Sequence, residues 1–150
     1  MAEQKQEFGA PPITAADLRM RMAEHELEDA KKAMAMRQKI AKEQEEFRQY
    51  FMNSEVTEED RQRLRSRVTR LAEQGQSEMC VLTFSSDFCS DGGRAINNFM
   101  SDWPTTLTGR AAKLYEIWER NVKLLGFKLE ARVLNYPDGI VGDIGLFLKW

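Results

Sequence analysis

Residues Ala15 to Met52 combine charged and apolar positions without a glycine, a proline or a turn cluster, which predicts one long helix. Its apolar residues first recur with the alternating four- and three-residue spacing of heptad core positions, as in a coiled coil. At 1.5 Å per residue the helix would be about 55 Å long, so a small domain cannot cover it alone. The seam therefore needs a partner segment or a second copy of the chain. Its positions are Ala16, Met20, Ala23, Leu27, Ala30 and Met34.

The seam then shifts by one position and continues through Ile40, Phe47, Tyr50 and Phe51, as expected where a supercoil loosens. Alanines at alternate core positions allow two helix axes to approach closely, and methionines fill irregular space between them. The other faces of this helix carry eight acidic and eight basic residues. The expected surface is therefore charge-balanced.

A second helix is predicted after Thr57, whose hydroxyl is a good N-terminal cap for the acidic residues that follow it. Its apolar stripe is about three turns long, and it ends near Gly75. The simplest arrangement is an αα-hairpin in which this stripe covers the 40–51 half of the long helix. The 16–34 seam would stay uncovered, so we expect a homo-oligomer. The stripe consists of Leu64, Val68 and Leu71.

The chain after residue 76 reads as a small domain of the order β-α-α-β-β. Apolar or alternating runs predict strands over 79–84, 127–133 and 144–148. Helical patterns cover 94–100 and 107–125, and Gly126 is a good helix terminator. A right-handed crossover would make the first strand parallel to the second, and the last two strands would form a hairpin. We therefore predict a three-stranded mixed sheet.

The predicted fold class is α+β, with a coiled-coil-like helical hairpin before the small sheet domain. We place a disordered tail over residues 1–14, ending in a helix cap at Thr14, then the oligomerisation region over 15–76 and the α+β domain over 77–150. In that small domain the second face of the sheet needs a cover, which either the helical hairpin or a second subunit would supply.

Composition narrows the class of function. A chain of 150 residues with a net charge of −2 does not bind nucleic acid or a membrane surface through bulk electrostatics. The sequence shows no signal-peptide pattern and no apolar run long enough to span a membrane. Cys80 and Cys89 have no metal-site spacing with His25, which is the one histidine. We expect a cytoplasmic protein with reduced thiols, without a metal or another cofactor.

The turn cluster over residues 85–93 is the best candidate for a ligand site. A Gly-Gly pair before a helix exposes backbone N–H groups that bind anions, although a purely structural turn is the favoured interpretation. Cys89 as a nucleophile would need a nearby base, and His25 is distant in sequence, so a half-buried inert thiol is favoured. The candidate ligand-binding residues are Asp87, Asp91, Gly92, Gly93 and Arg94.

The second helix also carries five arginines within ten residues, which could contact phosphates. Acidic residues flank them on both sides, so ion pairs within the chain or between subunits are the favoured interpretation. Nucleic-acid binding through this helix remains an alternative. The arginines are Arg61, Arg63, Arg65, Arg67 and Arg70.

Single residues add little further chemistry. His25 lies beside the seam and is better explained as a residue that tunes packing than as a phosphate acceptor. Trp118 belongs to an apolar stripe, whereas Trp103 and Trp150 fit either the core or a partner surface. No acid, base and nucleophile converge in the sequence, so we expect no catalytic activity.

The sequence predicts a non-enzymatic, homo-oligomeric interaction or regulatory protein. The helical region would join two copies as a homodimer, and the α+β domain would bind another protein or a ligand. Two alternatives remain open: a small anion-binding domain or enzyme that uses the 87–94 turn, and a nucleic-acid-binding regulator that uses the arginine-rich helix.

Overall fold

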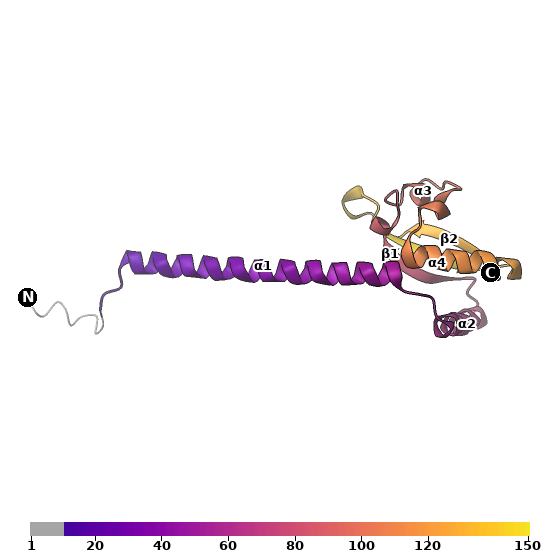
Figure 1. The fold of residues 1–150 in the computed structure, drawn as a ribbon, viewed down its shortest axis with the longest axis horizontal. Coiled ribbons are helices and arrows are strands. Elements are labelled where there is room, and N and C mark those ends of the chain that lie inside the picture. The colour runs from indigo at the N-terminus through magenta and orange to yellow at the C-terminus, as the bar shows by residue number, and fades with distance from the viewer. Residues whose placement is uncertain (1–10) are drawn as a thin grey trace, which may run out of the picture. The chain divides into compact units, whose positions relative to one another are not determined.

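The computed structural model describes residues 11–150 and shows an α+β protein (Figure 1). A long helix and a second helix precede a three-stranded antiparallel sheet that is interrupted by short helices. The chain divides after Phe47 into two compact units, each of which is described by itself. Residues 1–10 of the predicted tail lie outside the described residues. No helix within residues 11–150 has the length and the apolar character needed to cross a membrane.

The long helix α1 spans Ala15–Asn53, which confirms the predicted helix to within one residue. Its first turn is closed by a reciprocal cap. The Asp17 N–H donates to Thr14 Oγ1 at 3.1 Å, and the Thr14 N–H donates to the Asp17 carboxylate at 3.1 Å. Every residue from 11 to 50 is exposed to solvent. The predicted cap is therefore present, and no side chain of the first unit is buried within the described residues 11–47.

The second helix, α2, spans Glu58–Glu73 and also begins as predicted. The Asp60 N–H donates to the Thr57 hydroxyl, and the Thr57 N–H donates to the Asp60 carboxylate. The partner of this helix differs from the prediction, because α2 contacts strand β1, and Leu64 and Val68 face the sheet. We expected this apolar stripe to pack on the long helix, but its residues Leu64 and Val68 pack within the second unit, toward the sheet.

The sheet contains β1 (Glu78–Ser85), β2 (Lys128–Val133) and β3 (Asp143–Lys149) in the order β1-β3-β2. Both pairings are antiparallel, so the predicted mixed sheet is wrong. The predicted hairpin of the last two strands is confirmed, and its last strand inserts between the other two. β1 and β2 therefore run in the same direction but do not pair, because β3 occupies the position between them.

The first helix of the sheet domain is shorter than predicted, and the second has nearly the predicted length but changes its helical type along the way. The first is α3 (Arg94–Asn97), and the second begins as α4 (Gly109–Ile117). α4 continues as a π-helical turn over Trp118–Val122 and a 3-10 turn over Lys123–Leu125. Gly126, at φ 94°, ends this segment as predicted.

The core of the second unit lies on one face of the sheet, where Ile144 and Leu146 are completely buried. Phe51, near the end of α1, joins this core and places its ring 4.2 Å from that of Phe88. Gly109 makes this approach possible. A Cβ atom there would lie 2.8 Å from the Phe51 carbonyl oxygen, and its φ of +54° is also unfavourable for other residues. The start of α4 is therefore fitted closely to the end of α1.

The opposite face of the sheet is polar and charged. The Arg132 guanidinium donates to both oxygens of Glu78 and to Glu130, while Lys149 pairs with Glu130 at 3.2 Å. The same guanidinium lies 4.2 Å from the centre of the Phe147 ring. These contacts connect all three strands. Within one chain this face is therefore lined by charged side chains, and the cover that we expected from the helical hairpin or a second subunit stays a prediction.

Candidate functional site

The second unit contains a mainly apolar cavity of about 610 Å³ between α2, the α4–π segment and the apolar face of the sheet. It exists because the side chains of α2 do not fill the space above the strands. Its wall is mainly apolar and draws on elements that are far apart in the sequence. Representative side chains are Leu64, Val68, Val81, Trp118, Leu129 and Leu148.

The polar part of the cavity wall is positively charged. Among the described residues that line it, Arg61 and Arg65 are the charged ones. Both guanidinium groups share one carboxylate, that of Glu58, at 3.9 Å from Arg61 and 3.0 Å from Arg65. The Nε of Arg61 is buried and has no hydrogen-bond partner in the described structure. A buried donor without a partner has a free-energy cost, which is a local cost of packing α2 in this position.

The π-helical turn forms another part of the wall and presents Trp118 to the cavity. The indole N–H donates to the Phe127 carbonyl at 3.1 Å, and the Lys123 ammonium lies 5.7 Å from the ring centre. Leu125 also lines the cavity while 73% exposed, so the cavity meets solvent there. Single π turns of this kind occur frequently at functional sites.

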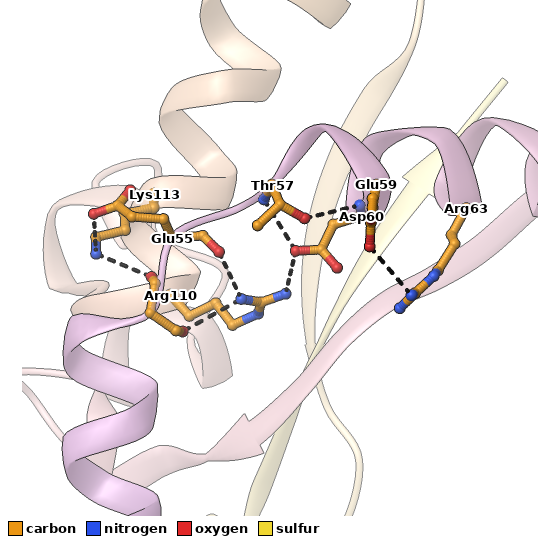
Figure 2. Close-up of polar contacts among 8 residues, drawn as sticks. Glu55, Thr57, Glu59, Asp60, Arg63, Arg110 and Lys113 are labelled. Carbon is orange, nitrogen blue, oxygen red and sulfur yellow. Dashed lines mark hydrogen bonds and ion pairs between the residues drawn. The ribbon is translucent and has the colours of Figure 1, made fainter.

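The N-terminal end of α2 is anchored to α4 by two basic side chains (Figure 2). Arg110 donates to the Ser54 hydroxyl, the Glu55 carbonyl and the Asp60 carboxylate at 3.3 to 3.4 Å. Lys113 donates to the Ser54 carbonyl and to the Glu55 carboxylate, at 3.0 and 2.9 Å. These bonds fix the segment that leads into α2 and so hold one side of the cavity in place.

The same anchor perturbs an ionisable group. Hydrogen bonds from Thr57, foremost its backbone N–H, and from Arg110 hold the pKa of the Asp60 carboxyl below its ordinary value of 3.8. Asp60 is therefore an anion under all physiological conditions. Asp60 caps α2 and accepts a hydrogen bond from Arg110. Its role is therefore structural rather than catalytic.

The predicted 87–94 turn is internally satisfied. The two oxygens of the Asp91 carboxylate accept hydrogen bonds from the Gly93 and Ala95 N–H groups, at 2.9 and 2.8 Å. These are the donors that an anion would have used. Gly92 and Gly93 both have positive φ, and the Asp87 N–H donates to Ser85. The arrangement supports the structural interpretation of this turn, in which Arg94 is exposed.

Cys89 is buried and far from nucleophilic. Burial, together with the charge of Asp91, raises the pKa of its thiol to about 11, so the sulfur stays protonated. His25 is exposed on α1, where it lies 3.3 Å from Asp29. Within residues 11–150, no group of three or more His, Cys, Asp or Glu side chains is placed to hold a metal ion.

The five arginines of α2 fall into two sets. Arg61 and Arg65 pair with Glu58 at the cavity, and Arg63 pairs with Glu59 at 3.7 Å (Figure 2). Arg63 also lines a shallow surface elsewhere on α2, together with Arg67 and Arg70. Ion pairing within the chain therefore accounts for three of the five arginines.

The predicted seam residues of α1 are all exposed, and the large ones strongly so. Met20 is 64%, Leu27 56% and Met34 61% exposed, with Ala23 and Ala30 between them on the same helix. A regular apolar stripe of this kind is unusual on a solvated helix, where apolar residues normally face a core. The structure therefore leaves the whole seam available to a partner.

Sequence reasoning identified the apolar stripes of both helices and of the strands but missed the cavity that they enclose. Periodicity shows which side chains share a face, whereas a cavity depends on how closely the faces approach. The positions of the three tryptophans also depend on packing that periodicity does not show. Trp103 packs against the core, Trp118 lines the cavity, and the Trp150 ring lies 6.5 Å from that of Phe127.

Comparison with known proteins gives no further guidance, because no protein family, no curated protein and no solved structure matches this chain.

Proposed function

We propose that this chain is a non-enzymatic interaction or regulatory protein that acts as a homodimer, in which α1 pairs with α1 of a second copy. The observation that carries the proposal is the exposed heptad seam, from Ala16 to Met34, on a helix that buries no side chain before Phe51. Pairing two copies would bury this seam on both helices. The second unit, with its own core, would then be presented twice by one dimer.

The seam chemistry supports a second copy rather than an unrelated partner. In heptad notation Met20, Leu27 and Met34 occupy position a, and Ala23 and Ala30 occupy position d. Large residues thus alternate with small ones along one line. In a parallel, in-register pair each layer packs against the identical layer of the other copy, so wide and narrow layers match without offset.

Charges beside the seam favour the same arrangement. In a parallel coiled coil, position g of one helix lies close to position e of the next heptad on the other helix. Arg19 (g) would face Glu24 (e) of the second copy, and Glu26 (g) would face Lys31 (e) of the second copy. Both pairs are attractive, and symmetry forms each of them twice.

These four side chains are available for such contacts. All are exposed, and in this stretch of the described structure the ion pairs join other residues, namely His25 with Asp29 and Lys42 with Glu46. The antiparallel alternative that packs a against d is centred on His25. It would place Glu24 opposite Glu24 and Glu26 opposite Glu26, and like charges there are repulsive. The charge pattern therefore supports a parallel dimer.

The first test is solution mass by light scattering, with two matched substitutions. Met20 and Met22 are both 64% exposed, but only Met20 lies on the seam. We expect a dimer for the wild-type chain, a monomer for Met20→Asp, because a charge would be buried in the interface, and an intact dimer for Met22→Asp. A wild-type chain that remains monomeric at high micromolar concentration would overturn the proposal.

Helix polarity is tested by exchanging charges. Glu26→Lys and Lys31→Glu should each weaken the dimer, because each creates like-charge contacts across the interface. The double variant should regain the wild-type affinity in a parallel dimer, because the exchanged charges at positions 26 and 31 are again opposite across the interface. In the antiparallel arrangement the double variant would stay weak. Lys32→Glu, which changes the charge on the outer face, is the control and should leave dimer affinity nearly unchanged.

A further inference from the structure

We propose that the cavity within residues 48–150 binds an anionic amphiphile, namely a single alkyl chain that ends in a carboxylate, as in a fatty acid. This inference goes beyond self-association and does not depend on it, because every residue that lines the cavity belongs to the second unit. It rests on two features of the cavity: its size and apolar wall, and the sign of its charge.

The size and the wall fit an alkyl chain. A volume of about 610 Å³ lies within the usual range for small-ligand sites, and such sites are mostly apolar with few polar groups. Leucine and valine side chains of α2, the sheet and the α4–π segment surround the space. Their exposed surface is unfavourable in water, and an alkyl chain would remove it from solvent. The apolar side chains beyond those already named include Leu114, Ile117 and Val122.

The charge of the wall selects the head group. Arg61 and Arg65 line the cavity, no acidic side chain does so among the described residues, and the nearby Glu58 is shared between both guanidinium groups. The site thus retains a net positive charge. A carboxylate would be attracted to it, whereas an ammonium head group would be repelled.

The two arginines place that head group. Arg61 and Arg65 lie together on α2 and are the charged residues of the described cavity wall. A carboxylate beside them would form charge-assisted hydrogen bonds with the guanidinium groups. The alkyl chain would then extend between α2 and the strands, toward the opening beside Leu125.

The test is calorimetric titration of the full-length protein with decanoate, decanol and decylamine, each below the concentration at which it forms micelles. We expect one decanoate per chain, with decylamine binding at least about tenfold more weakly, because a charge-assisted hydrogen bond is lost and a repulsion is gained. Across the series from hexanoate to decanoate, each added methylene should raise affinity about fourfold. Fluorescence of Trp118, which lines the cavity, should change with the same midpoint.

Two cavity variants and one control on the same helix locate the site. Arg61→Gln should weaken decanoate about tenfold but leave decanol unchanged, whereas Arg63→Gln, which alters the same helix away from the large cavity, should affect neither. Val68→Trp should fill the cavity and abolish binding of all three compounds. If Val68→Trp fails to fold, as judged by circular dichroism, the contrast between Arg61→Gln and Arg63→Gln still tests whether the carboxylate binds at the cavity.

The inference is overturned if no compound binds saturably, or if decanoate and decylamine bind equally. The Met20→Asp chain should bind decanoate as the wild-type chain does. A chain that binds decanoate without forming a dimer would support this inference alone. A chain that dimerises without binding decanoate would support the proposed dimer alone.

Discussion

Phe47 and Phe51 are one helical turn apart on α1, yet Phe47 is 53% exposed and Phe51 is 2% exposed. The two residues belong to different compact units of the chain. Phe51 reaches the aromatic core of the second unit, whereas residues 11–47, the described part of the first unit, contain no buried side chain. Two phenylalanines on the same helix thus differ in burial, and the difference depends on the neighbouring elements rather than on the local sequence.

The comparison also concerns the origin of stability. The second unit is stabilised by burial of its own apolar side chains on one face of a three-stranded sheet. Residues 15–47 have helix propensity, a capped first turn and exposed ion pairs, and each such ion pair contributes about 0.3–0.5 kcal/mol. Helices gain most of their stability from tertiary packing, so the stability of residues 15–47 should increase most when a partner binds.

The largest effect is expected in the core of the second unit. Leu146→Ala should lower the free energy of unfolding by about 2–5 kcal/mol, because Leu146 is completely buried and a cavity would remain. Denaturant unfolding followed by tryptophan fluorescence measures this loss. Phe99→Ala is the control, since Phe99 is 93% exposed, and it should cost less than about 0.5 kcal/mol. A loss below 1 kcal/mol for Leu146→Ala would contradict the assignment of the core.

A smaller loss is expected where α2 is anchored to α4. Arg110→Ala should destabilise the second unit by about 1–3 kcal/mol, because it removes the cation beside the partly buried Asp60 carboxylate and the donor to the Glu55 carbonyl, and Asp60 keeps only the Thr57 N–H among its described donors. The control is Arg120→Ala, which removes an exposed arginine that pairs with Glu116 and should cost at most about 0.5 kcal/mol. Equal effects of the two substitutions would show that the anchor contributes no more than a surface ion pair.

The boundaries of most elements could be predicted because their signals are local. Thr14 and Thr57 cap helices through bonds to residues three positions later, and Gly126 ends a helix through its own positive φ. The Pro137–Gly139 turn likewise specifies a hairpin, which the structure contains. In each case the deciding interaction lies within a few residues, so the sequence pattern reveals it.

The errors concern choices between distant partners. The stripe of α2 fits either α1 or the sheet, and periodicity does not distinguish them. Strand order is similar, because the hairpin leaves one edge of β2 and one edge of β3 open, and only packing decides that β1 joins β3. The cavity depends on the distance between α2 and the sheet, and the buried Arg61 Nε depends on the same distance. No pattern along the chain carries that information.

Acid should weaken the second unit through the charged face of its sheet. Hydrogen bonds from Arg132 hold the pKa of Glu78 below its ordinary value of 4.5. A lowered pKa in the folded state stabilises the protein above pH 4.5, and that stabilisation is lost as pH falls through the lowered value. Unfolding free energies measured from pH 7 to pH 3 should therefore fall less steeply for Glu78→Gln than for the wild-type chain. Parallel pH profiles would contradict a role for this ion pair.

The smallest effect is expected on α1. Lys42 and Glu46 lie 4.0 Å apart and are 78% and 66% exposed, so their ion pair is screened by water. A double-mutant cycle with Lys42→Ala and Glu46→Ala, analysed by denaturant unfolding at fixed chain concentration, should give a coupling energy of about 0.3–0.5 kcal/mol that vanishes in 1 M salt. Lys39→Ala, which removes a lysine from the same helix, should show no coupling to Glu46→Ala. A coupling above 1 kcal/mol would mean that this part of the helix is desolvated in solution, and the contrast between the two units would then be smaller than their exposure indicates.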